Sequence, residues 1–74
     1  MFTKEDIEGL DNSTYSDLET AYEQYFHKKY KSIVDMVNGE APNAKSVEEA
    51  AQKTIDNWNV DSANEAAQKA ANNP

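Results

Sequence analysis

Hydrophobic residues along this 74-residue chain recur in steps of three and four, which is the spacing of one face of an α-helix. The longest such run extends from Tyr15 to Val37, and polar residues fill most of the opposite side of the same helix. The apolar positions of this run are Tyr15, Leu18, Tyr22, Tyr25, Phe26, Ile33, Met36 and Val37. Ser16 and Glu19 form a capping box near its start, and Asn38–Gly39 is a stop signal at its end. We therefore predict one long helix here as the spine of the fold.

A short helix is predicted ahead of this spine, from Lys4 to Leu10. The Thr3 hydroxyl can accept a hydrogen bond from the backbone of the first turn, and Asp6 completes a weaker form of the capping box. Phe2 and Ile7 stand at the two positions of a hydrophobic staple, which fixes the angle at which a chain enters a helix. The N-terminal segment is therefore expected to add Phe2, Ile7 and Leu10 to the core.

Two further helices are predicted after a loop at residues 40–45. Serine caps each of them, at Ser46 and Ser62, and a glutamate three residues later closes each capping box. The asparagine, valine and aspartate at residues 59–61 are expected to separate the two helices. The apolar face of the third helix ends at Trp58, whereas the apolar face of the fourth is made of alanine alone.

These last two helices also repeat each other. Residues 46–57 and 62–73 are identical at seven of twelve positions, with an offset of sixteen residues. A local duplication explains the likeness, and so does convergence on a composition that favours helices. Two copies are fewer than a solenoid requires, so the repeat alone predicts no function.

Together these elements predict an all-α fold, in which a small bundle of three to four helices forms one domain, residues 1–74, around one long central helix. A chain this short buries only about 60% of its unfolded surface, so marginal stability is expected. The third helix should pack on the central one through its larger apolar residues, which are Val47, Ala51, Ile55 and Trp58.

The charge of the chain is strongly acidic and unevenly distributed. Fourteen acids stand against seven lysines and no arginine, which gives a net charge of −7. Residues 1–23 carry a net charge of −6, residues 24–34 one of +3, and residues 35–74 one of −4. Direct nucleic-acid binding is disfavoured, because phosphate backbones repel such a chain. The same charge steers association toward partners with a basic surface.

Few of the residue types that carry chemistry are present. The chain has no cysteine and one histidine, His27, which excludes a disulfide, a thiolate metal site and a multi-histidine site. Its two glycines, Gly9 and Gly39, are too far apart to form a phosphate-binding loop. Its carboxylates show no pairing that suggests two acids facing each other across a cleft. We therefore expect no enzyme activity, no metal and no cofactor.

The same composition bears on location. No apolar run approaches the length of a membrane span, and the first residues lack the basic and apolar regions of a signal peptide. Together with the absence of cysteine, this leads us to expect a cytoplasmic protein that does not bind membranes.

The candidate partner-binding residues combine an acidic group with part of the aromatic face. Residues 1–23 hold seven acids, more than two helix starts require. Lys29 falls inside the apolar arc of the predicted long helix. Either its stem snorkels past aromatic rings to water, or this part of the arc faces a partner. Tyrosines suit such an interface, although the same rings could fill the core. The candidates are Asp11, Asp17, Glu19, Glu23, Tyr25 and Lys29.

By elimination, the sequence predicts a small acidic, non-catalytic module that binds another protein, as an inhibitor or adaptor of the kind that a phage or another mobile element encodes. Two alternatives stay open. One is a structural or assembly subunit that works as a homo-oligomer, of which a homodimer is the simplest form. The other is a DNA mimic, whose carboxylates imitate phosphates and inhibit a nucleic-acid-binding protein. The interpretation that the acids only keep the chain soluble stays open as well.

Overall fold

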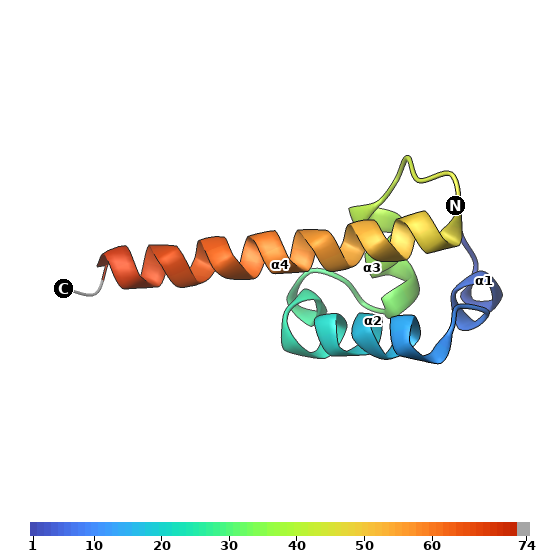
Figure 1. Ribbon diagram of the computed structural model, residues 1–74, viewed down its shortest axis with the longest axis horizontal. Helices are drawn as coiled ribbons and strands as arrows, with labels where there is room; N and C mark the ends of the chain where they lie inside the picture. Colours follow the sequence, from blue (N-terminus) through green and yellow to red (C-terminus); the bar gives the residue numbers. More distant parts are fainter. Residues whose placement is uncertain (73–74) are drawn as a thin grey trace.

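The computed structural model describes residues 1–72, with the surroundings of side chains up to residue 70, and this part of the chain contains helices and no strand (Figure 1). Its elements in chain order are α1 (Lys4–Glu8), α2 (Asn12–Gln24), the 3₁₀ turn η1 (Phe26–Lys28), α3 (Ile33–Glu40) and α4 (Val47–Asn72). The predicted all-α class is therefore confirmed.

The molecule is elongated because α4 is far longer than the other helices. Its 26 residues correspond to about 39 Å of helix, and the molecule measures 46 × 22 × 21 Å. The first half of α4 runs in the same direction as α2 and packs on α2 and α3, whereas the second half continues beyond them (Figure 1). We call residues 1–59 the head and residues 60–72, the projecting end of α4, the arm.

The prediction of one long helix from Tyr15 to Val37 is wrong, because the chain breaks at Tyr25. The backbone angles there, φ −140° and ψ −60°, are not helical. The break turns the Phe26 ring into the interior, where it is fully buried. The backbone stays hydrogen bonded through the break, since Lys29 N donates to Phe26 O at 2.9 Å. Burial of a large aromatic ring therefore replaces the regular helix at little cost in hydrogen bonds.

Both helices that flank this break have their own N-caps. α3 begins after Ser32, whose hydroxyl accepts a hydrogen bond from Asp35 N at 3.1 Å. α2 begins at Asn12 and not near Ser16, because Asp11 is its N-cap. Aspartate and serine are among the most favourable N-cap residues, so each helix start is set locally.

The predicted break at residues 59–61 is also wrong, and the predicted third and fourth helices are one helix, α4. No glycine or proline lies between Val47 and Asn72. Asparagine, valine and aspartate have lower helix propensity than alanine but do not end a helix that is already nucleated. Ser62 therefore lies inside α4 and caps nothing. The last residue of the second repeat, Asn73, lies outside the described residues.

Two of the predicted local signals are confirmed, and a third is close to the observed end of its helix. Thr3 and Asp6 form the capping box of α1, with Asp6 N donating to Thr3 Oγ1 at 3.2 Å and Thr3 N donating to Asp6 Oδ2 at 2.9 Å. Ser46 caps α4 by accepting a hydrogen bond from Glu49 N at 3.1 Å. The stop signal at residues 38–39 lies at the end of α3, which reaches Glu40.

The core is centred on Phe26 and not on Trp58. Trp58 is half-buried at the edge of the core, so its predicted place among the core residues is only partly correct. The buried hydrophobic residues are Ile7, Leu10, Leu18, Ala21, Phe26, Met36, Val37, Ala41, Ala50 and Ala51. Thr54 joins them without an unpaired hydroxyl, because its Oγ1 donates to Ala50 O at 2.8 Å. All these residues belong to the head, so the arm contributes no buried hydrophobic residue among those described.

Candidate functional site

The acidic surface extends along α1 and the full length of α2, from Glu5 to Glu23. Its seven acids are all exposed, and none of them forms an ion pair within residues 1–72. They are Glu5, Asp6, Glu8, Asp11, Asp17, Glu19 and Glu23. Four of the six candidate residues predicted from the sequence therefore lie on this surface, which we call the acidic end.

Asp11 differs from its acidic neighbours because its carboxylate is already engaged. It accepts hydrogen bonds from the hydroxyls of Ser13 and Thr14, at 2.6 Å each, and from Thr14 N at 3.3 Å. These hydrogen bonds, with that of Ser13 first, lower the pKa of Asp11 below its ordinary value. The charge is thus held in place at the start of α2, and a role in partner binding stays a prediction.

The three acids on α2 do not form one patch. Glu19 and Glu23 are one turn apart and point in nearly the same direction, whereas Asp17 points about 160° away from Glu19. All three are exposed. The acidic end therefore presents negative charge on two flanks of α2.

Tyr25 lies at the other end of α2, about 20 Å along the helix from Asp11. Its half-buried ring meets the Phe26 ring edge to face, with centroids 5.0 Å apart and planes at 86°. Tyr25 also lines a recess of about 250 Å³ between η1 and the arm. The other residues lining this recess are Gln24, Lys28, Ser62, Glu65, Ala66 and Lys69. Tyr25 therefore lies near Glu23 but far from Asp11, and the structure does not gather all six candidates into one site.

This recess marks where the head stops covering α4. Asp61, Ser62 and Glu65 are half-buried there, whereas residues 66–70 are all exposed. A second hollow of about 390 Å³ also contains Tyr25 and Glu65 in its lining. The arm thus leaves the head at Tyr25 and continues with its surface open.

The predicted position of Lys29 inside the apolar arc of a long helix is wrong, because residue 29 does not belong to an α-helix. Its side chain is 56% exposed, and its Nζ lies 3.9 Å from Glu40 Oε2. The same Nζ lies 6.0 Å from the centroid of the Tyr30 ring. Lys29 therefore sits over a polar cluster of the head, and its predicted role toward a partner stays untested.

That polar cluster is centred on Glu40, which sequence reasoning missed. The Glu40 side chain is only 9% exposed. Tyr30 Oη donates to its Oε2 at 2.5 Å, and Asn57 Nδ2 donates to its Oε1 at 3.1 Å. Burial, followed by the hydrogen bond to Glu40 and its charge, raises the pKa of Tyr30 to about 12. The cluster ties the end of α3 to the loop before it and to α4.

Gly39 makes this cluster possible. A Cβ atom at this position would lie 2.5 Å from Cε1 and 2.9 Å from Oη of Tyr30. The backbone of Gly39 does not have a positive φ, so the glycine is required here by the close approach of the tyrosine ring. From the sequence alone, this glycine is interpreted as part of a signal that ends a helix. In the structure, the glycine is needed because the Tyr30 ring approaches so closely.

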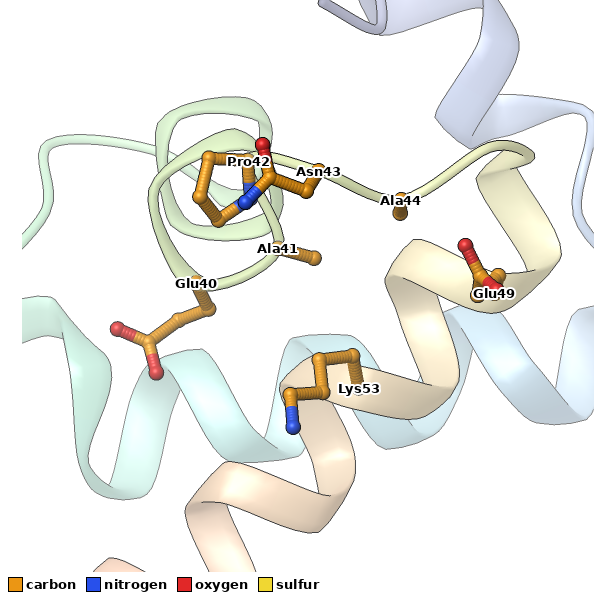
Figure 2. Close-up of a pocket in the computed structure, with 7 residues that line it drawn as sticks. All are labelled: Glu40, Ala41, Pro42, Asn43, Ala44, Glu49 and Lys53. Atoms are coloured by element: carbon orange, nitrogen blue, oxygen red, sulfur yellow. The ribbon is translucent and has the colours of Figure 1, made fainter.

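A shallow cleft of about 290 Å³ lies beside this cluster, between the loop after α3 and the first turns of α4 (Figure 2). Glu40 lines one end of it, and Glu49 and Lys53 line the side formed by α4. Both carboxylates already have hydrogen-bond partners within the chain. Glu40 accepts hydrogen bonds from Tyr30 and Asn57, and Glu49 accepts one from Lys45 N at 2.6 Å. The volume is at the small end for a ligand site, and the carboxylates serve to fix the loop.

Residues 1–72 contain no group of three or more histidine, cysteine, aspartate or glutamate residues that could hold a metal ion. No helix in the part of the chain that the structure describes is long and apolar enough to cross a membrane.

The candidate surfaces of this chain are thus the acidic end, the recess beside Tyr25 and the arm. They lie on different elements of the molecule and share no residue except where the recess meets the arm. Comparison with known proteins gives no significant match, because no family model fits the chain and no curated protein or solved structure is detectably similar to it.

Proposed function

We propose that the chain is a small, non-catalytic protein-binding module, an inhibitor or adaptor that engages a basic surface of another protein through its acidic end. One observation carries this proposal: the seven acids of residues 1–23 are exposed and form no ion pair within the described chain. Their charge is therefore available to a partner.

The stability of the head does not require most of these charges. Asp6 and Asp11 cap helices, but Asp17, Glu19 and Glu23 accept no hydrogen bond within residues 1–72. Unpaired like charges close together repel one another and weaken a compact fold. Association with a basic partner removes that cost and accelerates encounter, which supports a role in binding.

The experiment that tests this role compares two triple variants that remove the same charge. Asp17→Asn, Glu19→Gln and Glu23→Gln neutralise the acidic end. The control variant neutralises three exposed acids elsewhere by Asp35→Asn, Glu48→Gln and Asp56→Asn.

Wild type and both variants are used to capture a partner from the native cell, and the association rate constant is then measured with the purified partner. We expect the acidic-end variant to associate at least about 10-fold more slowly and the control to associate nearly as fast as wild type. The wild-type rate should fall when salt is raised from about 0.05 M to about 0.5 M. Equal rates for all three proteins, unchanged by salt, would leave the acids a solubility role only.

The DNA-mimic hypothesis is a narrower form of this proposal, and the identity of the captured partner tests it. It requires that the partner bind nucleic acid and that a DNA duplex compete with the chain for it. A partner that DNA does not displace restricts the function to an ordinary acidic inhibitor or adaptor.

A further inference from the structure

The side chain of Asn38 ties the N-terminal segment to α3. Its Oδ1 accepts a hydrogen bond from Phe2 N at 2.8 Å, and its Nδ2 donates to Phe2 O at 2.9 Å. Within the described part of the chain, these are the hydrogen bonds that join residues 1–10 to the rest of the head. The attachment therefore uses the side-chain amide of Asn38 both as a donor and as an acceptor.

The residue after Asn38 is set by a different contact. Gly39 lies against the Tyr30 ring, which leaves no room for a Cβ atom at this position. The fold therefore places an asparagine directly before a glycine, and each of the two residues is needed for its own reason. Asn38–Gly39 is the one asparagine–glycine step in the sequence.

An asparagine–glycine step is chemically labile, because the glycine has no Cβ atom to shield its backbone nitrogen. That nitrogen can attack the Cγ atom of the asparagine. A new N–Cγ bond closes a succinimide ring, the Cγ–Nδ2 bond breaks, and the amide nitrogen leaves as ammonia with the proton of the backbone nitrogen. Water then opens the ring to aspartate or isoaspartate. The sequence of steps consumes one water molecule and needs no oxidant or reductant.

The folded state keeps the two reacting groups of this step apart. Gly39 lies in the last turn of α3, where a backbone N–H points along the helix toward the carbonyl four residues before it. The Asn38 amide is held in place by Phe2. Attack therefore requires that the end of α3 opens. Because α3 has only eight residues and Gly39 is exposed, this is a local opening of the kind that folded proteins undergo.

We propose that Asn38 is a site of spontaneous deamidation, which the fold protects and whose conversion to an acid releases the N-terminal segment from α3. An ionised aspartate accepts hydrogen bonds but donates none. It can keep the bond from Phe2 N, but its second oxygen then faces Phe2 O, to which Asn38 Nδ2 donates at 2.9 Å. Two acceptors at this distance repel each other. This inference goes beyond the proposed function and does not rest on it.

The element most sensitive to this conversion is α1. It has only five residues, which is too short for a helix that is stable alone. Apart from the burial of Ile7 and Leu10, its attachment to the head depends on the hydrogen bonds of Asn38 to Phe2. We therefore expect residues 1–8 to open more often after conversion. Because the reaction does not reverse, the opened form accumulates with the age of the molecule.

Ageing of the full-length chain, folded and in denaturing urea at the same pH and temperature, tests the site and its protection. Peptide mapping by mass spectrometry measures Asn38 and, as the control, Asn43, which is followed by alanine in an exposed loop. In urea, Asn38 should convert at least about 10-fold faster than Asn43. In the folded chain, Asn38 should convert at least about 10-fold more slowly than in urea. Equal rates at the two asparagines in urea, or equal rates at Asn38 in both samples, would overturn the proposal.

Amide hydrogen exchange of Asn38→Asp and Asn43→Asp, which add the same charge, tests the release of the N-terminal segment. The Ile7 amide, which donates to Thr3 O at 3.2 Å within α1, reports on that segment. Its protection should fall at least about 5-fold in Asn38→Asp, the loss that one hydrogen bond produces, and should not change in Asn43→Asp. The converted chain, separated from the aged sample by its extra negative charge, gives the same measurement without a substitution. Wild-type protection of Ile7 in both Asn38→Asp and the converted chain would contradict the release.

Discussion

The two halves of α4 carry a repeated sequence, identical at seven of twelve positions, and have different surroundings. In the first half, Ala50, Ala51 and Thr54 are fully buried against the other helices. In the second half, the equivalent residues Ala66, Ala67 and Ala70 are exposed. Two causes produce this difference: sixteen steps of 100° leave the copies about 160° apart, and the head does not cover residues 66–70 on any side. The same residues are therefore core in one half and surface in the other.

This comparison separates two sources of helix stability. The first half of α4 is held by tertiary packing. The second half is held by alanine propensity and by a nucleus that the first half supplies. Substitutions in the head should therefore change the free energy of unfolding of the whole molecule, and the same substitutions in the arm should not.

The largest expected effect is that of Phe26→Ala, which empties the centre of the head. Removal of a fully buried phenylalanine should lower the free energy of unfolding by about 3–5 kcal/mol. Trp58→Ala should cost less, because Trp58 is only half-buried. Denaturant melts of both variants decide the order. A larger loss for Trp58→Ala would mean that the core is centred on α4 and not on the broken turn.

The same substitution at equivalent positions of the two copies tests whether the two halves of α4 differ in burial. Ala51→Leu forces a larger side chain into the packed head and should lower the free energy of unfolding by about 1–3 kcal/mol. Ala67→Leu makes the same change in the arm and should alter it by no more than about 0.5 kcal/mol in a dilute, monomeric sample. Equal losses would contradict the exposed position of the second copy.

A third substitution concerns the close contact at Gly39. Gly39→Ala should displace the Tyr30 ring and break its hydrogen bond to Glu40, worth about 1.5–3 kcal/mol because the acceptor is charged. Higher helix propensity returns up to about 1 kcal/mol, so we expect a net loss of about 1 kcal/mol by thermal or chemical denaturation. Gly9→Ala is the control, because a Cβ there would meet only ordinary contacts at 3.4 Å. A stabilised Gly39→Ala variant would show that the ring can move without loss.

The last expected effect, a loss of stability, appears only in alkali. The pKa of Tyr30 is raised in the folded state from 10.0 to about 12, so folding favours its neutral form. This contribution is fully present below pH 10 and is lost as the pH rises from 10 toward 12. Melts of wild type and Tyr30→Phe across this range should converge as the pH rises. Parallel curves would mean that Tyr30 is not protected by the fold.

The starts of α1 and α4 were predicted from their caps at Thr3 and Ser46, whereas the starts of α2 and α3 and the continuity of α4 were not. Ser32 and Ser62 are each followed by an acid three residues later, and only Ser32 caps a helix. The choice between them depends on Phe26, whose burial requires the break before Ser32, and no similar gain accompanies a break before Ser62. A capping pattern therefore marks a possible helix start but does not by itself show that a helix begins there.

The candidate sites also differ in how far they could be predicted from the sequence. The acidic end could be predicted because exposed charge follows directly from the sequence. Lys29 was assigned through a helix that does not exist, and for Tyr25, which is half-buried, the sequence left open whether the ring fills the core or faces a partner. Glu40 gave no signal, because its partners Tyr30 and Asn57 come from segments that only the fold brings together. Surface charge is a property of residues, whereas a buried polar cluster is a property of the fold.

The continuity of α4 is the central claim, and a distance across residues 59–61 tests it most directly. Spin labels on Gln52→Cys and Gln68→Cys, equivalent positions in the two copies, can be measured by pulsed electron paramagnetic resonance in a chain that has no other cysteine. Samples kept dilute, or mixed with unlabelled protein, exclude distances between molecules. A continuous helix predicts a narrow distribution at about 24 Å or longer. A broad distribution centred well below about 20 Å would mean that the chain bends at residues 59–61 and folds the second copy back onto the head.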